Sequence, residues 1–253
     1  MYLGSNDLQR AVAEPELKSP SFGGVDWQAR YQALALKAKD PRLRRFYEAG
    51  VVSMETPVCN AQLMAVDFET SGLDPSKHGI LSVGAVPFSL ARISCARAQH
   101  WLAKPRKPLS DESVVIHGIT HSQVERAPDL LDILDELLEA LAGHVWVVHY
   151  RAIERNFFDV ALRERIGEGI EFPVIDTMEL EARFHRQKKL NFWQRLKGER
   201  PVSIRLADAR SRYGLPFYRP HHALSDALAT AELLQAQIQH HYSTNTPLSD
   251  LCT

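Results

Sequence analysis

The stretch Met64–Gly72 (MAVDFETSG) places the strongest constraint on what this chain can fold into. It begins as an apolar strand but carries two carboxylates, Asp67 and Glu69, two residues apart. Side chains alternate along a strand, so these two acids project from one face while Val66 and Phe68 project from the other. Neighbouring acids at the end of a buried strand repel each other unless a cation neutralises them. Oxygen ligands favour Mg²⁺ or Mn²⁺, and an acidic turn without metal is an equally good interpretation of this stretch alone.

The composition narrows the class of protein. The 253 residues contain 30 Lys and Arg and 31 Asp and Glu, a net charge of −1. This balance argues against a general nucleic-acid coat protein and leaves room for an enzyme with a local basic track. The three cysteines are widely spaced, which predicts reduced thiols. The sequence shows neither a signal-peptide pattern nor an apolar run of membrane-spanning length, so we expect a cytoplasmic protein with no membrane partner.

The chain changes character near residue 60. Residues 1–60 contain an arm rich in Pro, Ser and Gly and two helix-start signals, Asp26 and Asp40-Pro41, so they are predicted to form an N-terminal helical extension. Residues 61–242 carry the strand and helix patterns of a main domain. Residues 243–253 are predicted to form a C-terminal tail.

From residue 62 the pattern predicts an α/β fold. Three consecutive antiparallel strands come first, and strands then alternate with helices. The expected strands are 63–68, 80–90, 93–103, 145–149 and 174–176. The expected helices are 129–142, 151–165, 203–213 and 222–241, with one more directly after residue 176. Together these elements describe a mixed sheet flanked by helices.

A third acid, Glu154, lies on the apolar face of the helix expected from residue 151. The apolar residues that follow it at helical spacing are Phe157, Phe158, Ala161 and Leu162. Glu154 is therefore expected to face the interior, where an acid needs a partner. That partner is either a shared metal or a salt bridge to Arg151 or Arg155. Asp159 lies roughly 140° around the helix and is expected to be solvated.

Two further candidates lie at the start of the last helix. Asp226 is surrounded by alanines, which allow a helix to approach a sheet closely. His221 comes just before the helix, whose positive end favours the neutral imidazole. A neutral imidazole can take a proton from water. The residues alone leave the alternative open that His221 and His222 only cap the helix.

Taken together, these residues resemble the DnaQ-like (DEDDh) 3′–5′ exonucleases, whose best-known member is the proofreading epsilon subunit of bacterial DNA polymerase III. The resemblance rests on Asp67-Phe-Glu69, on Glu154 five residues after His149, and on His221-x-Ala-Leu-x-Asp226, and it covers residues 63–237. One position departs from the family, which usually has Asp where this chain has Glu154. The resemblance implies an RNase H-like fold with a mixed five-stranded sheet.

The resemblance also implies a chemistry, which is two-metal hydrolysis of a phosphodiester at a 3′ end with release of nucleoside 5′-monophosphates. Asp67, Glu69, Glu154 and Asp226 would bind two divalent cations, Mg²⁺ or Mn²⁺, and His221 would act as general base. The residues implied to contact the terminal nucleotide are Thr70, Gly72, Leu73, His117 and His149.

The favoured substrate is a single-stranded or frayed 3′ end of DNA, with RNA as the alternative. Residues 183–200 mix cations with aromatic residues, which suits a single strand and equally suits a solvated helix whose aromatic residues face the core. Polymerase association is compatible with the family, although no segment of the chain points to it. The rival classes are a non-catalytic module that binds 3′ ends and an interaction protein that acts through residues 1–60.

Overall fold

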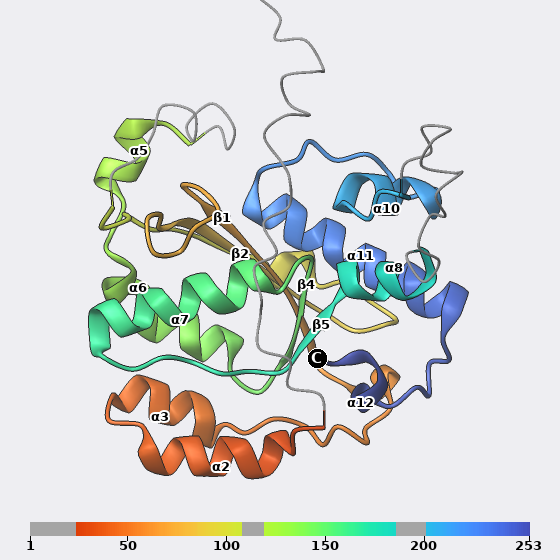
Figure 1. Cartoon of the computed structure of the whole chain (residues 1–253), viewed down its shortest axis with the longest axis horizontal. Coiled ribbons are helices and arrows are strands. Elements are labelled where there is room, and N and C mark those ends of the chain that lie inside the picture. The colour runs from red at the N-terminus through yellow and green to blue at the C-terminus, as the bar shows by residue number, and fades with distance from the viewer. Residues whose placement is uncertain (1–23, 108–118, 186–200) are drawn as a thin grey trace, which may run out of the picture.

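A five-stranded mixed sheet forms the centre of the protein. The computed structural model describes residues 24–107, 119–185 and 201–253, and helices cover both faces of the sheet (Figure 1). The strands are β1 (Leu63–Thr70), β2 (Ile80–Phe88), β3 (Gln99–Leu102), β4 (Val145–Val148) and β5 (Val174–Asp176), in the order β3-β2-β1-β4-β5. β1 to β3 form an antiparallel meander, whereas β4 and β5 run parallel to β1. The predicted fold is therefore confirmed.

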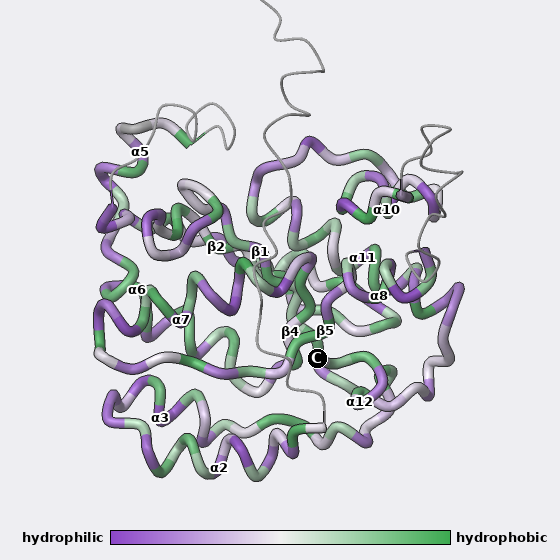
Figure 2. The backbone as a smooth tube through the Cα atoms, in the orientation of Figure 1, coloured by the Kyte–Doolittle hydropathy of each residue, from purple (hydrophilic) through white to green (hydrophobic). Residues whose placement is uncertain are grey.

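The helices surround this sheet. They are α2 (Trp27–Lys37), α3 (Pro41–Glu48), α5 (His121–Arg126), α6 (Leu130–Leu141), α7 (Ala152–Ile166), α8 (Thr177–His185), α10 (Leu206–Arg212), α11 (Ala223–His241) and α12 (Leu248–Leu251). Of these, α7 and α11 pack directly against the sheet. Hydrophobic and hydrophilic residues alternate along α6 and α7 (Figure 2), as expected for helices with one buried side. None of the helices in the described ranges has the length and apolar character that crossing a membrane would require.

The two helix starts that the sequence predicts near the N-terminus are confirmed. The Asp26 side chain accepts a hydrogen bond from the Ala29 amide at 3.1 Å, and Asp40 accepts one from the Arg42 amide at 2.9 Å. Phe46 of α3 packs edge-on against Trp146 of β4, with ring centroids 6.5 Å apart. The N-terminal helices therefore share the core of the main sheet.

The last residues also join this core. Leu248 and Leu251 are fully buried, and the Thr253 amide donates to the Val174 carbonyl at 3.0 Å. The division of the chain into residues 1–60, 61–242 and 243–253 stays a prediction about its organisation, although the described parts of all three segments contribute to one hydrophobic cluster.

Two details of the sequence prediction are wrong. β2 ends at Phe88 rather than at residue 90, and the third strand covers only Gln99–Leu102 rather than residues 93–103. The reason is a local turn, in which Ser89 and Arg92 exchange backbone hydrogen bonds, followed by a short 3₁₀ helix at Cys95–Arg97. α5 was not predicted. It begins at a capping box in which the side chains and amides of Thr120 and Gln123 bond reciprocally.

The two faces of β1 meet different helices. Phe68 packs edge-on against Phe158 of α7, with centroids 5.6 Å apart. Asp67 pairs across the ladder with Gly84 of β2, and Gly84 lies directly under Ala223 at the start of α11. Because laterally paired residues share a face, Asp67 projects toward α11 and Phe68 toward α7.

Gly84 allows α11 to approach the sheet closely. A Cβ atom at this position would lie 2.5 Å from the Leu224 nitrogen and closer still to the Ala223 carbonyl group. These are backbone atoms that cannot rotate away, so the first turn of α11 would have to move. The glycine is thus required for space, and it fixes how near the start of α11 comes to Asp67.

We predict that Gly84→Ala lowers the free energy of unfolding by about 1–3 kcal/mol through overpacking and loosens the first turn of α11. Urea denaturation measures the first effect and amide hydrogen exchange the second.

The matched control is Gly143→Ala. Gly143 has φ 72° and open space around its Cβ position, so alanine there is strained only by its backbone. Gly143→Ala should destabilise the protein without changing exchange in α11. If amide exchange in α11 were equal in the Gly84→Ala variant and the wild type, the close contact at Gly84 would not determine the position of the first turn of α11.

Candidate active site

Three carboxylates converge where β1 ends and α11 begins. One oxygen each from Asp67, Glu69 and Asp226 lies within 4.8 Å of the others. Glu69 is buried, and the other two acids are half-buried. β1 delivers the first two acids through its alternation, and the closely seated α11 delivers the third. Three oxygen ligands at this separation suit a divalent cation of the Mg²⁺ or Mn²⁺ type.

The electrostatics of the cluster favour such a cation. Burial, followed by the charges of Glu69, Asp226 and Glu154, raises the pKa of Asp67 well above its usual value. Burial and the charge of Glu69 raise the pKa of Asp226, while the hydrogen bond from the His221 amide opposes this shift. The carboxylates are therefore held close together despite their repulsion, and a bound cation would remove that penalty.

Glu154 reaches the same end of the sheet from the opposite layer. It is 1% exposed on the first turn of α7. Burial raises the pKa of its carboxyl well above the usual value, and hydrogen bonds from its own backbone amide and from that of Phe68 oppose the shift. Its Oε2 atom is buried without a hydrogen-bond partner. Glu154 lies outside the three-oxygen group but close enough for its charge to act on Asp67.

The salt-bridge alternative for Glu154 is not what the structure shows. Arg151 pairs with Asp176 and Glu179. Arg155 donates to the carbonyl groups of Phe172 and Thr253. In the described ranges, neither arginine forms an ion pair with Glu154. The rival acid, Asp159, pairs with Arg163 at 2.7 Å on the outer side of the helix, as expected for an acid on the other face.

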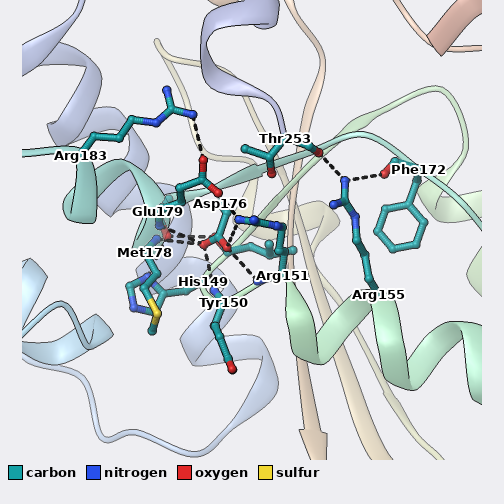
Figure 3. A network of polar contacts seen from close by, with 12 residues as sticks. His149, Tyr150, Arg151, Arg155, Phe172, Asp176, Met178, Glu179, Arg183 and Thr253 are labelled. Carbon is teal, nitrogen blue, oxygen red and sulfur yellow. Dashed lines mark hydrogen bonds and ion pairs between the residues drawn. The ribbon is translucent and has the colours of Figure 1, made fainter. Parts of the chain in front are cut away.

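Asp176 is a supporting acid that the sequence analysis did not single out (Figure 3). It is 3% exposed at the end of β5 and accepts from the amides of Tyr150, Arg151 and Met178, each at 3.0 Å. The Arg151 guanidinium donates to it as well, at 3.2 Å. Asp176 thereby fixes the loop between β4 and α7, which carries Glu154 into place. An acid directly before a helix is an N-cap signal, and that signal could have identified it.

Two non-glycine residues in the described ranges have left-handed backbones, and each precedes a helix that carries an acid. Tyr150 has φ 90° and His221 has φ 69°. A carboxylate holds each one, because Asp176 accepts from the Tyr150 amide and Asp226 accepts from the His221 amide at 2.7 Å. Such conformations are unfavourable and persist where surrounding contacts enforce them. The hydrogen bond from its amide therefore fixes the backbone of His221 relative to the carboxylate of Asp226.

The helix-capping alternative for the two histidines holds for the backbone position of His222 but not for a side-chain cap. His222 occupies the N-cap position of α11, but no side-chain capping bond forms there. Its ring instead stacks on His100 of β3, with centroids 4.9 Å apart and an interplanar angle of 30°.

The residues expected to contact a nucleotide lie in two places. Thr70 ends β1, and Gly72 and Leu73 lie in the turn that follows. The Thr70 hydroxyl donates to the Gly72 carbonyl at 2.8 Å, and Leu73 is 44% exposed. His149 follows β4 and bonds Thr177 Oγ1 at 2.8 Å through Nδ1. Burial lowers the pKa of His149 to about 4, so it is neutral at neutral pH. His117 lies outside the described residues.

The basic and aromatic segment 183–200 is described only as far as residue 185. Arg183 pairs with Glu179 at 3.1 Å, and Phe184 stacks on His241 with centroids 4.1 Å apart. Residues 186–200 lie outside the described ranges, so both interpretations of this segment stay open as predictions.

A family model supplies the deciding comparison. The RNase_T model, described as Exonuclease, matches residues 64–234, more than half of the chain. The chain belongs to the RNase_T exonuclease family. It therefore carries an exonuclease domain, an enzyme domain of the hydrolase class.

Relatives of this exonuclease domain carry polymerase names. A DNA polymerase III PolC-type protein of Thermotoga petrophila is 29% identical over 182 residues, which cover 72% of this chain and 12% of the relative. A DNA polymerase III subunit epsilon-like protein of Rhodobacter capsulatus is 28% identical, over 70% of this chain and 24% of the relative. The chain thus spans a small part of the length of these proteins.

Solved structures share the fold of the exonuclease domain. The nuclease domain of 3′hExo, a DEDDh family member bound to rAMP, aligns with a TM-score of 0.58 and 17% identity over 72% of this chain and 93% of that chain. Exonuclease X in complex with 5′ overhanging duplex DNA aligns with a TM-score of 0.56 and 21% identity over 75% and 98%. At these identities the likeness is one of fold.

We predict that Asp67→Asn raises the Tm of the metal-free protein by at least about 2 °C at pH 7. The pKa of Asp67 is higher in the folded protein than its ordinary value of 3.8. The protonated carboxyl is therefore tolerated in the fold at low pH, and the protein loses stability as pH rises through the folded pKa and the carboxyl becomes charged. Asparagine removes that loss, and the gain should vanish near pH 4. Thermal unfolding in EDTA across this pH range measures it.

Asp74→Asn is the control of opposite sign. Hydrogen bonds from Ser76 and the nearby Lys77 lower the pKa of the exposed Asp74 to about 2, so Asp74 stabilises the fold at neutral pH and its removal should lower Tm. A lower Tm for metal-free Asp67→Asn at pH 7 would contradict the account of repulsion in the cluster.

Proposed function

We propose that this exonuclease domain hydrolyses the terminal phosphodiester of a nucleic acid in the 3′–5′ direction with two divalent cations, and that DNA is its substrate. The observation that carries the proposal is the convergence of Asp67, Glu69 and Asp226, whose oxygens lie within 4.8 Å of one another. This convergence occurs in a chain of an exonuclease family.

The residues present fit such a pair of cations. Asp67 would bind both, Glu69 and Asp226 would hold one of them, and Glu154 would hold the other directly or through water. The orphaned, buried Oε2 of Glu154 supports this role, because an unpartnered carboxylate oxygen is unfavourable in the interior. When bound, paired divalent cations activate water and stabilise the leaving oxygen.

His221 is the proposed general base. Its backbone amide donates to the carboxylate of Asp226, a proposed cation ligand. This hydrogen bond holds the imidazole of His221 close to the proposed cations. The imidazole is exposed at the start of α11 and would take the proton of the attacking water. Products would be nucleoside 5′-monophosphates.

The terminal nucleotide would lie against the turn after β1. The exposed side chain of Leu73 would pack against its base, and the backbone near Thr70 and Gly72 would bind its sugar. His149 and His117 are the further residues proposed to line this pocket. His149 lies in the loop after β4, which hydrogen bonds to Asp176 and Thr177 hold in place. This fixed position supports a role for His149 in lining the nucleotide pocket.

A DNA substrate is favoured because the relatives carry the name of DNA polymerase III. RNA is the second candidate, because the 3′hExo nuclease domain shares the fold and was solved with rAMP bound. The proposed substrate is a single-stranded or frayed 3′ end. We also propose that the protein associates with a polymerase and acts in the cytoplasm.

The direct test uses a 5′-labelled single-stranded DNA with Mg²⁺ or Mn²⁺. Wild type should shorten it stepwise from the 3′ end, EDTA and Asp67→Asn should abolish shortening, and His221→Ala should reduce kcat by about 10²–10⁴-fold because the base is lost. The same panel on a mismatched duplex and on a short RNA determines the substrate class. Undiminished shortening by Asp67→Asn would refute the site.

Glu154 is tested in the same assay by two matched variants. Glu154→Gln keeps the volume and removes the charge, whereas Glu154→Asp keeps the charge and restores the residue usual in the family. The proposed ligand role predicts greater activity for Glu154→Asp than for Glu154→Gln. Wild-type activity in Glu154→Gln would exclude Glu154 as a ligand.

A further inference from the structure

A row of residues crosses the sheet from the acidic cluster to its edge. Asp67 of β1 pairs with Gly84 of β2, and Gly84 pairs with His100 of β3. Paired residues share a face, and adjacent strands lie about 4.8 Å apart, so His100 lies about 10 Å from Asp67 on the same face of the sheet. Because Gly84 has no side chain, the first turn of α11 occupies the space above the middle of this row.

That close seating brings a second histidine to the same place. His222 directly follows the proposed base and directly precedes Ala223, which touches Gly84. Its ring stacks on His100 at 4.9 Å. We call His100 and His222 the histidine pair. Both residues are exposed, and in the described ranges neither imidazole makes a hydrogen bond.

The chemistry of the histidine pair suits a polyanionic backbone. Burial and the neighbouring His222 lower the pKa of His100, and an imidazole ring offers an N–H donor at its edge in either protonation state. Phosphate oxygens are the common acceptors for side-chain donors in nucleic-acid binding, and such contacts position the strand without reading its sequence.

The proposed position of the terminal nucleotide determines which sides of the cluster are left for the rest of the strand. In the proposed function the terminal nucleotide occupies the turn after β1, around Thr70 to Leu73. The rest of the strand must leave the cluster by another side, and the exposed histidine pair lies on the side of β2 and β3. We propose that the histidine pair binds the phosphate of the nucleotide that precedes the scissile bond, as a sequence-independent subsite of the exonuclease domain.

This inference rests on the proposed function, and two substrates separate them. The p-nitrophenyl ester of thymidine 5′-monophosphate carries one phosphate and occupies only the cluster and the terminal-nucleotide pocket. Oligothymidylate adds the preceding phosphates. His100→Phe and His222→Phe retain the aromatic stack and remove the N–H donors. Each should lower the ratio of kcat/KM on oligothymidylate to kcat/KM on the ester about tenfold, mainly through KM on the strand.

The controls distinguish the outcomes. His240→Phe replaces an exposed histidine near the other end of α11 and should leave the ratio at its wild-type value. Unchanged Tm in His100→Phe and His222→Phe would confirm that the fold is retained. A wild-type ratio in both variants overturns the inference while the proposed function stands. Wild-type protein that hydrolyses neither substrate overturns the proposed function and this subsite with it.

Discussion

The repulsion among carboxylates gathered at one end of the sheet is the constraint on which the site depends. Asp67 and Glu69 cannot move apart, because strand alternation places both side chains on one face of β1. The first turn of α11 brings the carboxylate of Asp226 to within 4.8 Å of theirs. Burial and mutual charge raise the pKa of Asp67 and Asp226. A fold that keeps this arrangement forgoes stability in the metal-free state, a pattern typical of sites built to bind a cation.

Asp176 shows the contrasting way to bury an acid. Its two oxygens accept several hydrogen bonds, mostly from backbone amides, and its charge is balanced by Arg151. Glu154 has no arginine partner in the described ranges, and one of its oxygens has no hydrogen bond. Asp176 ends β5 and binds the loop that leads into α7, whereas Glu154 lies in the first turn of α7. The difference between them separates a structural carboxylate from one that is available to a ligand.

Much of the site could be predicted from the sequence because its signals are local. The alternation of β1, the helical spacing that turns Glu154 inward and the alanines around Asp226 each depend on a few neighbouring residues. The lateral register that places Gly84 beside Asp67 and His100 depends on pairing between distant segments. The bonds from Asp176 to the loop after β4 likewise join residues 25 or more apart in the chain. Such contacts leave no periodic pattern, which explains why the sequence does not point to Gly84 and His100, and why it shows Asp176 only as a possible N-cap and not as the acid that holds this loop.

The most direct test of the central claim is anomalous diffraction from crystals of the wild-type protein soaked in Mn²⁺. The account predicts one manganese peak ligated by Asp67, Glu69 and Asp226 and a second near Asp67 and Glu154, both weakened or lost in Asp67→Asn. Crystals that show no manganese at these carboxylates at millimolar Mn²⁺, or peaks that persist unchanged in Asp67→Asn, would contradict it.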